Sequence, residues 1–196
     1  MTTGDLPLGI GVGDVNADGN LDIATGNFFG GNGSLITGNG DGTFNSFVEI
    51  PMVPSGATES VGVQDAIIGD FNEDGWGDLA FTVQSGDLGD PGLAILLNDG
   101  TGNFPGLPTF IAFSTQPRGL AVADIDQDDN LDIIYSDRDL HTLFIARGNG
   151  DGTFTVDDST LLTNELDLGL YNLTLAAYSD ELAQMTERTL ELEVSL

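Results

Sequence analysis

The sequence predicts an all-β protein made of three similar repeats followed by a separate C-terminal pair of strands. An Asp-rich motif occurs three times, and its copies begin 56 and 54 residues apart, as DVNADGNLD from Asp14, DFNEDGWGD from Asp70 and DIDQDDNLD from Asp124. A Gly-rich second element follows each copy and ends at Phe44, Phe104 and Phe154. Two sequence elements that recur in the same order define an internal repeat.

Each repeat is predicted to contain four short strands. Apolar runs precede the Asp-rich motif at residues 8–13, 66–69 and 120–123, and others follow it at 21–25, 78–82 and 131–136. Further strands are predicted at 34–38, 92–97 and 142–146, with another near 47–51 or 109–113. Asn-Gly and Asp-Gly pairs between the runs favour tight hairpin turns. Four short antiparallel strands are typical of one β-propeller blade, so residues 1–158 are predicted to form three propeller-like blades.

The C-terminal part, residues 159–196, lacks the repeat pattern. GLYNLTLAAYS and RTLELEVSL alternate apolar and polar residues, and DELAQMTE between them fits a helical turn. Alternation of this kind predicts strands with one buried and one wet face. Because a two-stranded ribbon is marginally stable alone, we expect this β-strand pair to act as a docking or assembly segment.

Oxygen-bearing side chains at positions 1, 3, 5 and 9 of each motif predict a calcium site. Calcium prefers six to eight oxygen ligands, and alternate positions of a tightly curled loop can converge on one ion. Position 7 is predicted to add a backbone carbonyl. About three calcium ions are therefore expected, held by Asp14, Asn16, Asp18, Asn20 and Asp22; by Asp70, Asn72, Asp74, Trp76 and Asp78; and by Asp124, Asp126, Asp128, Asn130 and Asp132.

Glycine at position 6, Gly19 or Gly75, permits the positive φ that reverses the chain around an ion. The third motif has Asp129 there, which predicts a slightly strained loop. An EF-hand would need Glu at position 12 and flanking helices, but position 12 is Thr25, Phe81 or Tyr135. A dockerin-type pair of loops would also need helices. The remaining alternative is an Asx-rich turn without metal, which three copies ending in Asp at position 9 disfavour.

Composition excludes several functional classes. The net charge is −28, from 32 acidic and 4 basic residues, which disfavours nucleic acid as a partner. The chain has no cysteine, so disulfides, thiolate metal sites and cysteine nucleophiles are excluded. No apolar run is long enough to span a membrane, and the first residues do not resemble a signal peptide. His141, the single histidine, has no evident catalytic partner, and we expect no enzymatic activity.

Over roughly residues 8–155, these motifs resemble the FG-GAP or VCBS-type repeats of integrin-α-like β-propellers. The resemblance implies a nine-residue loop that joins the first two strands of each blade and holds calcium at the positions given above. Propellers usually close with four to eight blades. Three blades would therefore belong to a larger ring, stack as an open array, or be completed by other subunits. The C-terminal strand pair instead resembles the end of an immunoglobulin-like domain.

These features predict a calcium-stabilised structural protein of the extracellular space or cell surface. Its expected partners are copies of itself, assembled into a surface fibre or layer through strand or ribbon complementation. The alternative is an adhesin-like binding module that recognises a glycan or an extracellular protein through propeller loops. A hydrolase with an accessory propeller is the third hypothesis.

Overall fold

The computed structural model describes residues 3–52, 62–84, 91–113 and 116–156, together with 174–175 and 188–189. The chain divides into two units, Met1–Thr160 and Leu161–Leu196. The described residues are all-β: they contain strands, turns and loops but no helix, and hence no helix able to span a membrane. The expected helical turn at residues 180–187 lies outside them.

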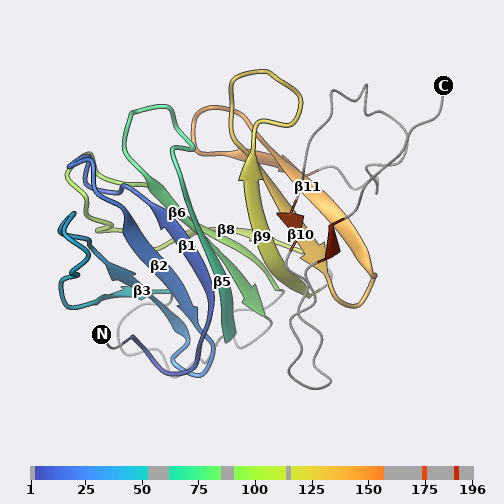
Figure 1. Cartoon of the computed structure of the whole chain (residues 1–196). Coiled ribbons are helices and arrows are strands. Elements are labelled where there is room, and N and C mark those ends of the chain that lie inside the picture. Colours follow the sequence, from blue (N-terminus) through green and yellow to red (C-terminus); the bar gives the residue numbers. More distant parts are fainter. Residues whose placement is uncertain are drawn as a thin grey trace. The chain divides into compact units, whose positions relative to one another are not determined.

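The first unit contains three four-stranded antiparallel sheets, in which strands adjacent in sequence pair in order (Figure 1). The first sheet comprises β1 (Pro7–Gly13), β2 (Asp22–Asn27), β3 (Asn32–Ile36) and β4 (Val48–Pro51). The second comprises β5 (Gly62–Gly69), β6 (Asp78–Gln84), β7 (Gly92–Leu96) and β8 (Thr109–Ala112). The third comprises β9 (Pro117–Ala123), β10 (Asp132–Asp137), β11 (Thr142–Gly148) and β12 (Phe154–Val156). The predicted four-stranded repeat is confirmed.

In the second unit, β13 (Thr174–Leu175) pairs antiparallel with β14 (Arg188–Thr189), so the two predicted C-terminal runs contribute paired strands. The rest of the predicted ribbon lies outside the described residues.

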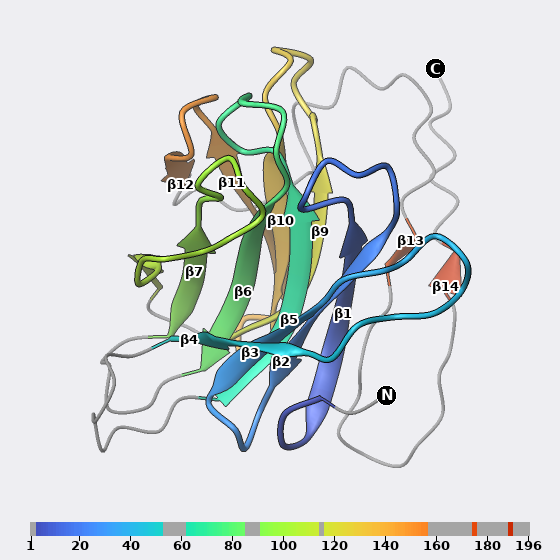
Figure 2. The ribbon, with the colours of Figure 1, turned by 90° about the vertical axis from the view of Figure 1, so that its left-hand side faces the viewer.

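The three sheets form a series through their first strands, because β1 packs on β5 and β5 packs on β9 (Figure 2). Within the described residues this series is open, and the sheets do not close a ring. One apolar cluster joins the first and second sheets, with Ala24 and Leu35 on one side and Ile68 and Phe81 on the other. A second cluster joins the second and third sheets, through residues such as Ile95 and Ile133.

Close approach of β1 and β5 depends on glycine. A Cβ atom added to Gly11 would lie 2.7 Å from the Ile67 Cα atom, which is closer than real Cβ contacts. Since the obstacle is backbone rather than a movable side chain, any larger residue would push the first two sheets apart. The Gly-rich run GIGVG before the first Asp-rich motif is thus explained by packing.

A partly buried carboxylate, Asp65 on β5, bridges the second and third sheets. Its Oδ2 atom accepts the Leu120 N–H of β9 at 2.8 Å, and its Oδ1 atom accepts the Ala66 N–H at 2.9 Å. Burial raises the pKa of Asp65 to about 6, although both hydrogen bonds lower it. The charged form is therefore destabilised in the folded protein at neutral pH.

We expect Asp65 to make the folded chain more stable as pH falls. The folded protein binds the proton near pH 6 and the unfolded chain only near 3.8, so stability increases as pH falls through 6 towards the unfolded value. Between pH 7 and 5 this gain is about 1 kcal/mol. Urea unfolding in a constant excess of calcium should show a larger gain in the free energy of unfolding for the native chain than for Asp65→Asn, which retains Asp78 with its pKa also raised to about 6. If the free energy of unfolding changed equally with pH in the two proteins, the proposed contribution of Asp65 would be contradicted.

Candidate functional site

The three Asp-rich motifs form loops that join the first two strands of each sheet. Loop 1 (residues 14–21) joins β1 to β2, loop 2 (70–77) joins β5 to β6, and loop 3 (124–131) joins β9 to β10. The φ angle at position 6 is positive in all three, at 82° for Gly19, 87° for Gly75 and 72° for Asp129. The predicted chain reversal, including the exceptional Asp129, is confirmed.

A second reversal at position 4 was not predicted. Ala17, Glu73 and Gln127 have φ angles of 54°, 58° and 61°. None of these residue types favours the left-handed region, so the sequence carries no signal for it. Two reversals within three residues tighten each loop and turn the side chains of positions 1, 3 and 5 toward one another.

The position 1 aspartate organises each loop through backbone donors. Its carboxylate accepts the N–H of position 6 in every copy, at 2.8 Å from Gly19 to Asp14, 2.8 Å from Gly75 to Asp70 and 3.1 Å from Asp129 to Asp124. The position 5 carboxylate similarly accepts the N–H of position 7, at 2.8 to 2.9 Å. These bonds leave further lone pairs on the same oxygens for a cation.

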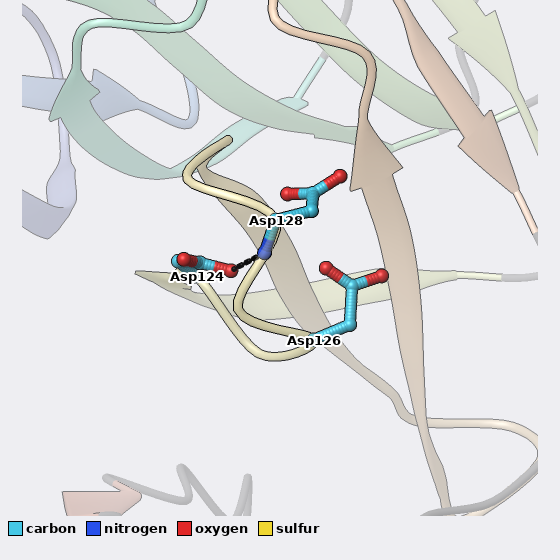
Figure 3. Close-up of side chains that lie close together, drawn as sticks. All are labelled: Asp124, Asp126 and Asp128. Carbon is cyan, nitrogen blue, oxygen red and sulfur yellow. Dashed lines mark hydrogen bonds between the residues drawn. The ribbon is translucent and has the colours of Figure 1, made fainter.

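Loop 3 brings three carboxylates together, as Figure 3 shows for Asp124, Asp126 and Asp128. One oxygen from each lies within 4.8 Å of the others. Calcium binds oxygens at about 2.3–2.6 Å. Two oxygens on opposite sides of one ion are therefore separated by about twice that length, which is close to the 4.8 Å found in loop 3. The pKa of Asp128 is lowered, chiefly by the Asn130 N–H, which favours the charged form. The donor set and its spacing fit a calcium ion.

Loops 1 and 2 carry asparagine at position 3, and its amide bonds the carboxylate at position 5. Asn16 Nδ2 donates to Asp18 Oδ2 at 3.1 Å, and Asn72 Nδ2 donates to Asp74 Oδ2 at 3.0 Å. Positions 1, 3 and 5 are therefore adjacent in these loops too. Among the described residues, however, the triple acidic group occurs in loop 3.

The position 9 aspartates, Asp22, Asp78 and Asp132, are buried, with at most 1% of each residue exposed. One oxygen accepts the N–H of position 2 at 2.9 Å in each repeat. The other accepts an N–H at the start of the second element, from Gly38 at 2.8 Å, Asn98 at 2.8 Å and Gly148 at 3.0 Å. Through these hydrogen bonds the carboxylates connect the loop to the second element and act as a latch between them. They are not members of the triple acidic group. Their role as ligands stays a prediction.

Position 7 side chains pack beneath the second element. A Cβ atom on Gly40 would lie 2.1 Å from Asn20 Oδ1, and one on Gly150 would lie 2.2 Å from Asn130 Oδ1. In the second repeat, Trp76 occupies this place, beside Gly100 and partly buried. The predicted ligand at position 7 is a backbone carbonyl, so this packing is compatible with it.

The second element is a hairpin turn held by its own side chains. The Thr43 N–H donates to Asp41 Oδ1 at 2.9 Å, and the Thr153 N–H donates to Asp151 Oδ1 at 3.0 Å. The threonine hydroxyls donate to the same oxygens. These aspartates thus accept hydrogen bonds within the turn, in agreement with the tight turns predicted from the Asn-Gly and Asp-Gly pairs.

Arg147, which the sequence did not point to, contacts loop 3. Its Nη1 atom lies 2.5 Å from Asp126 Oδ2, and both side chains are about one third exposed, at 36% and 38%. The pair is 21 residues apart in sequence and depends on the pairing of β10 with β11. The guanidinium group offsets part of the negative charge of the loop with the most carboxylates.

Replacing Arg147 by glutamine is expected to tighten calcium binding to loop 3 by roughly threefold to tenfold, because a positive charge beside a divalent ion is removed. Calorimetric titration of single-loop variants would measure this. Arg138→Gln is the matched control, since Arg138 pairs with Asp139 at 3.3 Å outside the loops. Weaker binding in Arg147→Gln would instead show that the arginine positions Asp126.

Replacing Asp129 by glycine is expected to stabilise the folded chain by about 1 kcal/mol, because glycine adopts positive φ without strain. Gly75→Asp, the reverse change, should destabilise loop 2 by a similar amount. A Cβ atom on Gly75 meets nothing within 4 Å, so backbone strain alone is tested. Denaturant unfolding of both variants measures the effect, and no change in either would refute the strain.

Comparison with curated proteins found no match. Among solved structures, a lectin from Agrocybe aegerita, described as specifically recognising non-reducing terminal N-acetylglucosamine, is similar with a TM-score of 0.47 and 23% identity. The similarity covers 79% of this chain and 38% of the lectin chain, so this chain spans well under half of that protein. The FG-GAP-like repeat pattern matches residues 14–81 and 70–135, which together exceed half of the chain. The chain therefore belongs to the FG-GAP-like repeat family.

Proposed function

We propose that this chain is a calcium-stabilised, non-catalytic structural module of the extracellular space or cell surface. Its three sheets are interpreted as propeller-like blades, and copies of it assemble into a fibre or layer through strand or ribbon complementation. The observation that carries the proposal is the group of three carboxylates in loop 3, with oxygens within 4.8 Å of one another.

Charge supports calcium as the stabilising ion. Ionised carboxylates so close together repel one another, and a divalent cation removes this repulsion. Loops 1 and 2 repeat the same backbone reversals and the same hydrogen bond from position 6 to position 1. The three loops are therefore expected to bind ions of the same kind, and ion binding contributes to folding because the unfolded chain has no such site.

The ion also supports an external location. Extracellular calcium modules work with weak sites, in the range of about 10⁻⁴ to 10⁻³ M, and the position 3 and 5 ligands here lie at or near the surface. A net charge of −28 would be partly neutralised where calcium is abundant. The chain has only 4 basic residues and no cysteine.

Assembly is supported by the C-terminal strand pair. β13 and β14 form a two-stranded sheet without a third strand among the described residues. Two strands alone are marginally stable, and free strand edges pair readily with another chain. A strand from a second copy would supply the missing partner.

Light scattering and electron microscopy of the full chain in calcium test this function. Native protein should form ordered assemblies that dissociate on chelation, and Thr189→Pro should weaken them because proline removes a backbone donor from β14. Thr189→Val is the matched control, since valine keeps the donor and the branched side chain. A chain that stays monomeric in calcium would refute assembly, and glycan binding by that monomer would favour the adhesin-like alternative.

A further inference from the structure

Successive sheets pack through the same positions of the repeat. The leading face of a sheet is defined as the face that packs on the preceding sheet. In the second sheet it includes Ala66 and Ile68 of β5, which are at most 9% exposed and belong to the cluster shared with the first sheet. In the third sheet the equivalent residues, Leu120 and Val122 of β9, pack on the cluster shared with the second.

The first sheet has the same leading face, but no preceding sheet among the described residues covers it. Ile10 and Val12 of β1, at the positions of Ala66 and Ile68, are 65% and 54% exposed. Leu21 is 64% exposed, whereas its counterpart Leu131 packs in the cluster between the second and third sheets. Apolar positions whose side chains are buried in the second repeat or partly buried in the third are therefore uncovered in the first.

The second element repeats the same contrast. Phe154 packs edge-on against Phe71 of the preceding repeat, at 5.4 Å between ring centroids, and the Gly152 N–H donates to the Phe71 carbonyl at 2.9 Å. Phe44, the counterpart of Phe154, is 37% exposed. Gly42, the counterpart of Gly152, has no neighbour within 4 Å of an added Cβ atom.

The third sheet presents the complementary, trailing face. Trailing positions of the second sheet are filled by buried residues, such as Ala80, Leu93 and Ile95. Their counterparts in the third sheet are also aliphatic: Ile134, which is itself 2% exposed, Leu143 and Ile145. Leu143 and Ile145 are partly exposed, although Leu93 and Ile95 are at most 2% exposed.

We propose that the leading face of the first sheet binds the trailing face of the third sheet of a second copy of this chain. The contact continues the packing seen twice between sheets of one copy. β1 contains no charged residue from Pro7 to Gly13, so the strip can approach a second acidic copy without burying a charge. Such head-to-tail association closes a ring or extends a filament.

The contact rests on the self-assembly proposed above and adds a second, independent interface to the ribbon. It predicts that Val12→Asp weakens self-association of the full chain in calcium by at least about tenfold, because a charge enters an apolar contact. Val48→Asp is the matched control. Val48 is 61% exposed on β4, which β2 and β3 separate from β1, and association should not change. Sedimentation velocity measures the dissociation constants, and circular dichroism verifies folding.

A mixing experiment tests the head-to-tail geometry. In Thr189→Pro protein, Val12→Asp blocks one face and Ile145→Asp the other, so each of these variants alone should be monomeric. The mixture retains one intact pair of faces and should form a heterodimer. If Ile145→Asp does not fold, Leu143→Asn replaces it. These measurements are made in parallel in Thr189→Val protein, which keeps the ribbon contact, and in Thr189→Pro protein, which lacks it. The contribution of the face contact is thereby separated from that of the ribbon.

Two results would overturn the proposal. In one, Val12→Asp and Val48→Asp associate as strongly as the native chain, which would leave ribbon assembly intact and exclude the face contact. In the other, the mixture stays monomeric, which would mean that something other than a second copy covers these faces.

Discussion

Removal of calcium is expected to lower the melting temperature of the full chain by roughly 15 °C or more. At a hundredfold excess over the dissociation constant, one site that binds only the folded state contributes about 2.7 kcal/mol. Three independent sites would contribute about 8 kcal/mol, and about 1 kcal/mol corresponds to roughly 2–4 °C in a chain of this size. Calorimetric melting in excess calcium and in excess chelator measures the difference.

Magnesium provides the control for this prediction. Magnesium demands near-octahedral geometry at about 2.0–2.1 Å and retains several waters, so it should restore only a small part of the lost stability. Equal melting temperatures in calcium and in chelator would mean that the Asp-rich loops are structural turns. Equal rescue by magnesium would mean that the ions act through general screening of the −28 charge.

Replacing Asp78 by alanine is expected to destabilise the folded chain by about 3–5 kcal/mol. The side chain is fully buried, and its two oxygens accept the Phe71 N–H at 2.9 Å and the Asn98 N–H at 2.8 Å. Both donors would lose their partner away from water. Asp78→Asn keeps one acceptor, so about half of that loss is expected. Urea unfolding of the three proteins gives the values.

The calcium dependence of this loss separates two roles of Asp78. A latch between loop and second element acts with or without the ion, so the loss should persist in chelator. Asp41→Ala is the surface control, because its carboxylate is exposed and accepts bonds within one turn, and it should cost less than about 1 kcal/mol. A loss in Asp78→Ala no greater than in Asp41→Ala would contradict the latch.

The sequence predicted the local parts of this molecule well. Strand positions and the loop between the first two strands follow from apolar runs around each Asp-rich motif. Positive φ at position 6 follows from Gly19 and Gly75, and by repetition from Asp129. Each of these features depends on residues close together in the chain, where spacing and residue type determine the backbone.

Contacts between sheets were not predictable in the same way. Asn98 Nδ2 donates to the Val15 carbonyl at 2.7 Å, across 83 residues of sequence, and Leu120 bonds Asp65 across 55. Arg147 reaches Asp126 because two strands pair in one register. The hydrogen-bonding role of the position 9 aspartates was also not predictable, because the same residue type can serve as a buried hydrogen-bond acceptor or as a metal ligand.

Counting bound calcium tests the central claim most directly. Equilibrium dialysis of the full chain against labelled calcium, with Asp124→Asn/Asp126→Asn/Asp128→Asn protein in parallel, gives the number of ions per chain. We predict about three ions for the native chain and one fewer for the variant. An equal count in the two proteins, or no bound calcium at millimolar concentration, would contradict the assignment of these loops as calcium sites.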